Sequence, residues 1–131
     1  MSSGKEIKTM AKKILIVEDN DLNRRLFSDL LSNKGYQVFE CAEGKSALSK
    51  AVEIKPDLIL MDIQMPEVDG LTATKMIRNT PEIAKTKIIA VTAFAMDGDC
   101  DRILAGGCDG YISKPIAIAN FLKTVEDMLA K

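Results

Sequence analysis

The chain has 131 residues, 47% of them hydrophobic and 28% charged, so it can bury one core but has no room for a second domain. Its 18 Lys and Arg residues nearly balance 19 Asp and Glu residues, and no basic tract is present, which argues against nucleic-acid binding. The chain has neither an apolar run near the roughly 20 residues of a membrane span nor a secretory signal, so we expect a cytoplasmic protein without membrane insertion.

The first residues are predicted to be a leader. Residues 1–9 are polar and include a Ser-Ser-Gly run, so we expect them to be disordered and place the folded domain at residues 10–131. A solid apolar strand is predicted at residues 14–17. It runs directly into Glu18 and Asp19.

A helix is expected next, capped by Asn20 or Asp21 and ended by Gly35. Its buried stripe is predicted to consist of Leu22, Leu26, Phe27, Leu30 and Leu31. The following strand, at residues 36–41, alternates with polar Gln37 and Glu40. Alternation is typical of an edge strand.

Strands and helices continue to alternate to the end of the chain. Further strands are predicted at residues 58–61, 88–91 and 111–113, and the first two are solid apolar runs typical of central strands. Helices are predicted after Gly44, at residues 71–78, at residues 97–104, and over a last stripe of Ile118, Phe121, Leu122, Val125, Met128 and Leu129. The helix at residues 97–104 has few apolar anchors, so we expect it to be the least firmly held.

This alternation predicts an α/β fold, a three-layer αβα sandwich around five parallel strands. With the second strand at an edge, the strand order 2-1-3-4-5 of flavodoxin-like folds follows. The ligand crevice of such a sheet lies where the order reverses, between the first and third strands. Glu18, Asp19 and Asp62 stand at those two strand ends.

The predicted sheet edge collects groups suited to a metal and a phosphoryl group. Asp62, Thr92 and Lys114 each follow a strand, and the carboxyl ends of parallel strands meet at one edge. Three crowded carboxylates repel one another unless a divalent cation lies among them. A threonine hydroxyl and a lysine ammonium beside that cation suit phosphoryl oxygens, so we predict chemistry on Asp62.

The cysteines and the lack of histidine argue against zinc sites and Cys-His nucleophiles. Cys41, Cys100 and Cys108 form no C-x-x-C pair, and we interpret them as small buried residues in a reducing compartment. The chain has no histidine, so a zinc site or a Cys-His nucleophile is not expected. Any phosphohistidine in a phosphorelay must therefore belong to another molecule.

In its motifs the chain resembles the receiver domains of bacterial two-component response regulators. The matching segments are ILIVEDN, DLILMDIQMPEVDG, VTAFA and YISKP, and the similarity covers nearly all of residues 13–129. The segments LILMDIQMPEVDGL, AVTAFAMDGD and YISKPI further resemble single-domain regulators of cell division in this family. That likeness implies a role in cell-cycle or cell-division control and recruitment to cell poles by partner kinases.

The resemblance implies that Asp62 is the phosphoacceptor. Asp19 would ligate Mg²⁺, for which Mn²⁺ could substitute, and Glu18 would do so through a water. Asp62 and the Gln64 backbone carbonyl would complete the protein's share of ligands. Lys114, in a cis peptide bond with Pro115, would neutralise a phosphoryl oxygen.

The resemblance also implies how the signal is read and how long it lasts. Thr92 would hydrogen-bond a phosphoryl oxygen, and Thr92 and Tyr111 would switch together, reshaping a surface that the fourth helix, fifth strand and fifth helix form. Gln64 and Phe94 would flank the acyl phosphate and slow its hydrolysis.

The implied partners are a histidine kinase or histidine phosphotransfer protein and a downstream target on that surface. The protein is then a phosphoacceptor signalling module rather than an enzyme, and a monomer or weak dimer. It could also serve as an intermediate in a phosphorelay.

Other functional classes fit less well. A flavodoxin-like FMN binder needs backbone donors for a phosphate where Glu18 and Asp19 would repel it. A metal-dependent phosphohydrolase could use Asp62, but Gln64 stands where its second acid is expected. A metal-dependent nuclease or isomerase would need a basic surface for a polyanionic substrate.

Overall fold

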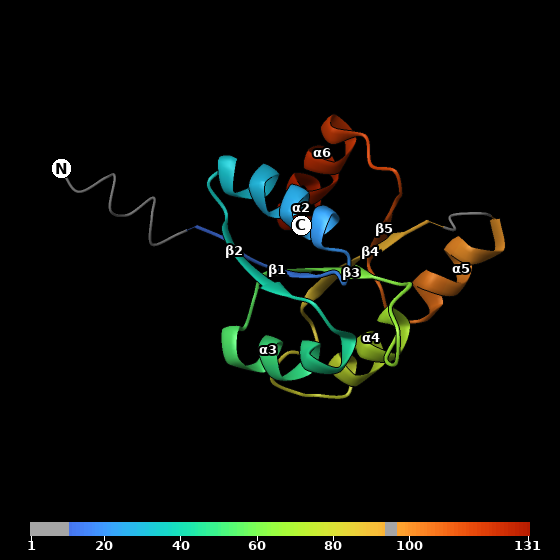
Figure 1. Ribbon diagram of the computed structural model, residues 1–131. Helices are drawn as coiled ribbons and strands as arrows, with labels where there is room; N and C mark the ends of the chain where they lie inside the picture. The colour runs from blue at the N-terminus through green and yellow to red at the C-terminus, as the bar shows by residue number, and fades with distance from the viewer. Residues whose placement is uncertain (1–10, 94–96) are drawn as a thin grey trace.

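The computed structural model describes residues 11–93 and 97–131. A five-stranded parallel sheet lies at the centre, in the predicted order β2-β1-β3-β4-β5 (Figure 1). The strands are β1 (Lys13–Val17), β2 (Gln37–Cys41), β3 (Leu58–Asp62), β4 (Lys87–Thr92) and β5 (Gly110–Ser113). The polar side chains of Gln37 and Glu40 on β2 are exposed, in keeping with its edge position.

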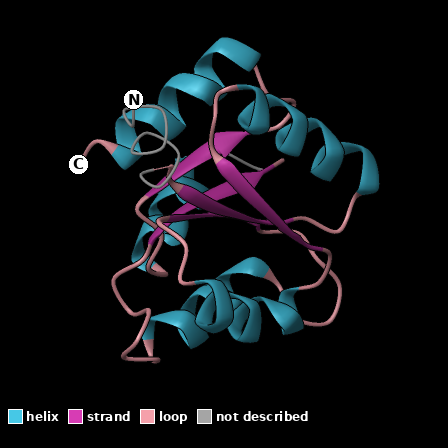
Figure 2. Ribbon diagram, turned by 90° about the vertical axis from the view of Figure 1, so that its left-hand side faces the viewer, coloured by secondary structure: helices cyan, strands magenta, loops and turns pink. Residues whose placement is uncertain are grey.

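Helices cover both faces of the sheet. Figure 2 shows the resulting three layers, with the strands in the middle and helices above and below them. One face carries α2 (Asp21–Asn33) and α6 (Ile118–Leu129), and the other carries α3 (Ala47–Ile54) and α4 (Gly70–Arg78) (Figure 1). A short 3-10 helix, η1 (Gly44–Ser46), precedes α3, and α5 (Asp97–Ala105) lies beyond β4. The fold class predicted from the alternation of elements is confirmed.

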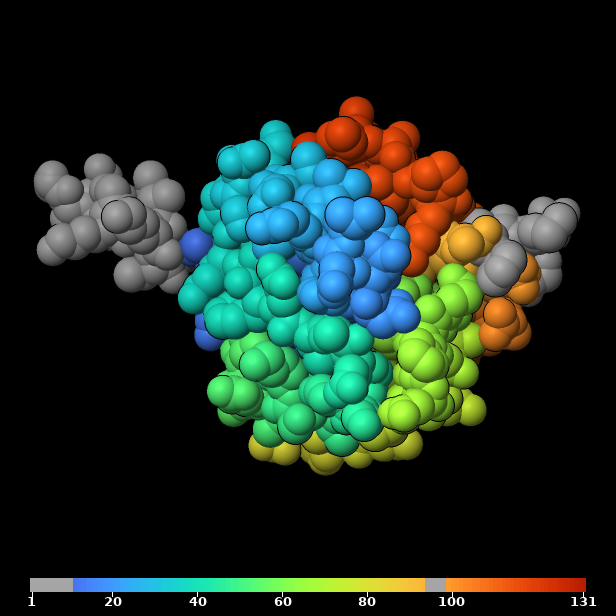
Figure 3. All heavy atoms as spheres, viewed as in Figure 1, coloured from blue at the N-terminus to red at the C-terminus, as the bar shows by residue number. Residues whose placement is uncertain are grey.

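Each face of the sheet has its own hydrophobic core. Under α2 and α6, Phe27 and Phe121 stack with ring centroids 5.1 Å apart, and the surfaces of the two helices adjoin in the space-filling view (Figure 3). On the other face, Ala47, Ala73 and Ile103 bring α3, α4 and α5 against the sheet. Among the described residues of α5, Ile103 is the one buried hydrophobic side chain, in keeping with the few apolar anchors of this helix.

The buried stripe predicted for the first helix is partly wrong. Leu22 is 80% exposed and Leu26 is also exposed. The inward line of α2 instead runs through Phe27 and Leu31, and one turn earlier it is continued by Arg24, whose side chain is only 18% exposed.

Two further predictions of burial need correction. Ile118 is 51% exposed because it is the first residue of α6 and the buried residues of that helix begin one turn later, at Phe121. Cys41 and Cys108 are buried as expected, but Cys100 on α5 is only half-buried. None of the three cysteines, all of which lie in the described part of the chain, forms a disulfide bond.

The start of α4 is fixed by a cap and a close approach. The Asp69 side chain accepts a hydrogen bond of 2.8 Å from the backbone N–H of Thr72, so the helix begins at Gly70, one residue before the predicted start. A Cβ atom at Gly70 would lie 2.3 Å from the backbone oxygen of Asp62. This glycine therefore lets α4 begin directly against the end of β3.

Within the described residues, no helix has the length and apolar character to cross a membrane.

Candidate functional site

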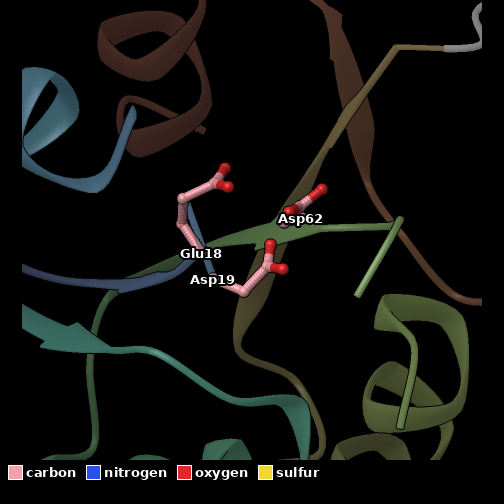
Figure 4. Close-up of side chains that lie close together, drawn as sticks. All are labelled: Glu18, Asp19 and Asp62. Carbon is pink, nitrogen blue, oxygen red and sulfur yellow. The ribbon is translucent and has the colours of Figure 1, made fainter. Parts of the chain in front are cut away.

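Three carboxylates converge at the carboxyl edge of the sheet (Figure 4). In the register of β1 and β3, Val17 pairs with Met61, so Glu18 and Asp62 follow on neighbouring strands. One carboxylate oxygen from each of Glu18, Asp19 and Asp62 lies within 4.8 Å of the other two. Glu18 and Asp62 are each only 1% exposed, whereas Asp19 is exposed.

Two of the buried oxygens suit a cation. Asp62 Oδ1 accepts a hydrogen bond of 3.2 Å from the Gln64 backbone N–H, and Glu18 Oε2 accepts one of 3.2 Å from the Asn20 N–H. Among the described residues, Asp62 Oδ2 has no hydrogen-bond donor, and Glu18 Oε1 makes no hydrogen bond but forms an ion pair with Lys114. Buried carboxylate oxygens without donors are costly, and a divalent cation bound by oxygen ligands would satisfy them.

Lys114 is the cation that the structure places beside this cluster. Its Nζ atom lies 3.3 Å from Glu18 Oε1 and 3.3 Å from Asp62 Oδ1. The Lys114 N–H donates a hydrogen bond of 2.7 Å to the Thr92 carbonyl, which anchors the backbone after β5 to the end of β4. The peptide bond between Lys114 and Pro115 is cis.

The cluster changes the acid strength of Asp62. Burial and the neighbouring carboxyl groups of Glu18 and Asp19 raise the pKa of Asp62 from 3.8 to about 8, and Lys114 offsets part of this increase. Asp62 therefore ionises less readily than an ordinary aspartate.

Gln64 connects the acidic cluster to Thr92. It stands in the loop after Asp62, and its Nε2 donates a hydrogen bond of 3.0 Å to the buried Thr92 hydroxyl. Its Oε1 accepts one of 3.1 Å from the Ala93 N–H. Phe94, predicted beside the phosphate, lies outside the described residues.

Tyr111 lies on β5 and is 39% exposed. In the register of β4 and β5 it pairs with Ala90, two residues before Thr92. A hydrogen bond with the Cys100 thiol on α5 raises the pKa of Tyr111. Tyr111 therefore contacts the element that we predicted to be least firmly held.

Arg24 was not among the predicted site residues. Its guanidinium donates a hydrogen bond of 2.9 Å to the backbone carbonyl of Glu18. A local signal existed in the sequence, because Asp21 and Arg24 are spaced to pair on a helix. The contact with Glu18 depends on how α2 packs over β1, which that spacing does not reveal.

The arrangement as a whole suits binding of a divalent cation and transfer of an anionic group. Two buried carboxylates and one exposed carboxylate lie within 4.8 Å of one another, and Lys114 lies beside the two buried ones. The cationic and hydroxyl groups nearby could stabilise charge on a phosphoryl group attached to Asp62.

Comparisons with known proteins agree with this geometry. A family model described as the response regulator receiver domain matches residues 14–126. The polar-differentiation response regulators DivK of Brucella anthropi and Brucella ovis are each 51% identical over 120 residues, which cover 92% of this chain and 98% of each relative.

Solved structures give the same result. The receiver domain of sensor histidine kinase PA1611 from Pseudomonas aeruginosa, described with a magnesium ion coordinated in its active-site cleft, has a TM-score of 0.85 and 34% identity, covering 92% of this chain and 99% of that one. Chemotaxis protein CheY4 of Vibrio cholerae has a TM-score of 0.85 and 30% identity, covering 90% and 98%.

Proposed function

This chain belongs to the response regulator receiver domain family, and we propose that it accepts a phosphoryl group on Asp62 from a phosphohistidine of a partner protein. The observation that supports this most is the convergence of Glu18, Asp19 and Asp62 within 4.8 Å, with Lys114 3.3 Å from two of them. The receiver family is a family of signalling modules, so the output is a change in binding rather than turnover of a substrate.

Asp62 would act as the nucleophile. Its Oδ1 is held by the Gln64 N–H and by Lys114, so Oδ2 is the oxygen that we expect to attack phosphorus. The new O–P bond forms as the P–N bond to the partner's imidazole breaks, and the imidazole leaves with the electron pair of that bond. The product is an acyl phosphate on Asp62.

The three carboxylates would hold Mg²⁺, with Mn²⁺ as an alternative and the Gln64 backbone carbonyl as a further ligand. The cation would offset the charges of the carboxylates and of the incoming phosphoryl group. Because the pKa of Asp62 is about 8 without a cation, bound metal also favours the ionised carboxylate that attack requires.

Lys114 and Thr92 would stabilise the product. The ammonium of Lys114 already lies 3.3 Å from Asp62 Oδ1 and can pair with a phosphoryl oxygen there. The Thr92 hydroxyl accepts a hydrogen bond from Gln64 and can donate its own proton to a second phosphoryl oxygen. Gln64 and Phe94 are proposed to slow hydrolysis by water, so that dedicated phosphatases reset the protein.

The output surface is proposed to comprise α5, β5 and α6. Movement of Thr92 toward a phosphate would let Tyr111 turn inward from its exposed position and reshape the surface near Ile116. A downstream protein that prefers this state would favour phosphorylation in return. The similarity to DivK supports a role in cell-cycle control with recruitment to a cell pole, which a fluorescent fusion would reveal as polar foci that vanish without the partner kinase.

The test uses acetyl phosphate as a small phosphodonor. We expect intact-mass spectrometry to show one added phosphoryl group on the native chain with Mg²⁺, and none with EDTA or in Asp62→Asn. Asp57→Asn is a matched control. Asp57 precedes β3 and accepts a hydrogen bond of 2.8 Å from the Lys13 N–H, so this substitution should leave labelling intact. Steady release of inorganic phosphate from phosphate esters would instead favour a phosphohydrolase.

A further inference from the structure

Arg24 holds the loop that carries two of the three carboxylates. Its Nη1 atom donates a hydrogen bond of 2.9 Å to the carbonyl oxygen of Glu18. Its Nη2 atom lies 2.5 Å from Asp21 Oδ1, and its Nε atom lies 3.4 Å from Glu40 Oε1 on β2. One planar guanidinium therefore joins the end of β1, the first turn of α2 and the edge strand.

The backbone at Glu18 is held from two sides. Its N–H donates a hydrogen bond of 3.0 Å to the Cys41 carbonyl, and its own carbonyl accepts from Arg24. That carbonyl belongs to the peptide unit that joins Glu18 to Asp19. Because a peptide unit is planar, fixing its carbonyl fixes the plane that contains the Cα atoms of both residues, which restricts where their side chains can point.

The position of Arg24 on its helix points to a role beyond packing. The inward line of α2 is otherwise apolar, with Phe27 and Leu31 buried in the core. A hydrophobic residue in the first turn would extend that core. Arg24 instead donates a hydrogen bond to the carbonyl of Glu18, in the segment that carries Glu18 and Asp19.

We infer that Arg24 is a positioning residue for the divalent-cation site: by fixing the peptide between Glu18 and Asp19, it aims two carboxylates at the space that Asp62 borders. This inference rests on the proposed function, in which those carboxylates hold Mg²⁺. Groups that orient metal ligands typically change metal affinity about 10- to 100-fold when they are removed.

The charge of Arg24 predicts an effect of opposite sign. Removing a cation that contacts the Glu18 backbone makes the surroundings of the site more negative, which by itself strengthens Mg²⁺ binding. Loss of the contact with the Glu18 carbonyl frees the ligands and weakens binding. Arg24→Gln removes both charge and fork, whereas Arg24→Lys keeps the charge but replaces the planar fork with a single ammonium.

The experiment is an Mg²⁺ titration of the full chain without phosphodonor, followed through the backbone amide signals of Glu18, Asp19 and Asp62 by ¹⁵N NMR. We expect Arg24→Lys and Arg24→Gln to raise the Mg²⁺ dissociation constant about 10-fold, with a native-like spectrum retained. Glu40→Gln removes only the outer ion pair and should bind Mg²⁺ like the native chain. If Arg24→Gln does not fold, the comparison of Arg24→Lys with Glu40→Gln still tests the inference.

Arg78→Lys is the matched control. Arg78 is also a bridging arginine, 24% exposed, which bonds the Gly107 carbonyl at 3.0 Å and Asp109 at 3.0 Å, ahead of β5 and away from the carboxylates. Arg78→Lys should lower stability against urea and leave the Mg²⁺ affinity unchanged. If Arg24 had a purely structural role, the Arg24 variants would likewise lose stability against urea and keep the native Mg²⁺ affinity.

Two other results would overturn the inference. Native affinity in Arg24→Lys, or tighter binding in Arg24→Gln, would show that Arg24 does not position the ligands, while the proposed function would stand. A native chain that shows no saturable response to Mg²⁺ would overturn both the inference and the proposed metal site.

Discussion

Replacing Asp62 with asparagine should stabilise the metal-free protein, although the substituted residue lies at the centre of the proposed site. The carboxylate is 1% exposed and lies beside Glu18 and Asp19, so ionising it in the folded state is costly. Asparagine has nearly the same shape and can still accept from the Gln64 N–H, but it introduces no negative charge. Function and stability are therefore opposed at this position.

The magnitude follows from the pKa of Asp62. Its folded value is about 8 and its ordinary value is 3.8, so at pH 7 the unfolded chain gains the free energy of ionisation and the folded chain does not. One pKa unit corresponds to about 1.4 kcal/mol, and the interval from the ordinary value to pH 7 therefore corresponds to roughly 4 kcal/mol. The buried amide of asparagine retains part of the desolvation cost, so we expect a gain of about 2 to 4 kcal/mol.

Urea unfolding at pH 7 in EDTA, followed by circular dichroism, measures this difference. Asp109→Asn supplies the opposite case, because Asp109 Oδ2 accepts from Arg78 at 3.0 Å and from the Ile88 N–H at 2.8 Å. That variant should lose about 1 to 2 kcal/mol. If Asp62→Asn were less stable than the native chain at an unchanged dependence on urea, the electrostatic account of the site would be refuted.

Three further predictions concern pH, switching and phosphate lifetime. The folded-state pKa of Asp62 exceeds its unfolded value, so the native state binds more protons than the unfolded chain between these two values. The free energy of unfolding without metal should therefore fall as the pH rises from about 4 to about 8, and a flat profile in EDTA would contradict this prediction. Saturating Mg²⁺ should remove most of the pH dependence. Beryllofluoride, which mimics an acyl phosphate, should shift NMR signals of Tyr111 and α5 as well as those of the metal site, and changes confined to the metal site would rule out the proposed output surface. Phe94→Ala should lose its phosphate faster than the native chain, and an equal decay rate would count against shielding.

The fold could be predicted from the sequence because its signals are local and agree with one another. Solid apolar runs mark β1, β3 and β4, and polar Gln37 and Glu40 mark β2 as an edge. Right-handed crossovers then leave few strand orders. Exposure within helices was less predictable, because Leu22 has the apolar character of a core residue but faces away from the line of Arg24, Phe27 and Leu31.

The site could be predicted as a set of residues but not as an electrostatic unit. Glu18, Asp19, Asp62 and Lys114 meet because parallel strands share a carboxyl edge, which the order of the elements already implied. Contacts that depend on helix packing over the sheet, such as that of Arg24 with the Glu18 carbonyl, have no signature in spacing. The raised pKa of Asp62 likewise depends on burial that only the assembled layers create.

The central claim is best tested by transfer from a phosphohistidine, followed by location of the phosphate. A ³²P-labelled histidine phosphotransfer protein would be mixed with the native chain and Mg²⁺, and the acyl phosphate would be mapped by borohydride reduction and peptide mass spectrometry. The account predicts rapid loss of label from the donor and a single modified residue, Asp62. Transfer that persists in Asp62→Asn, or a label on any other residue of the native chain, would contradict it.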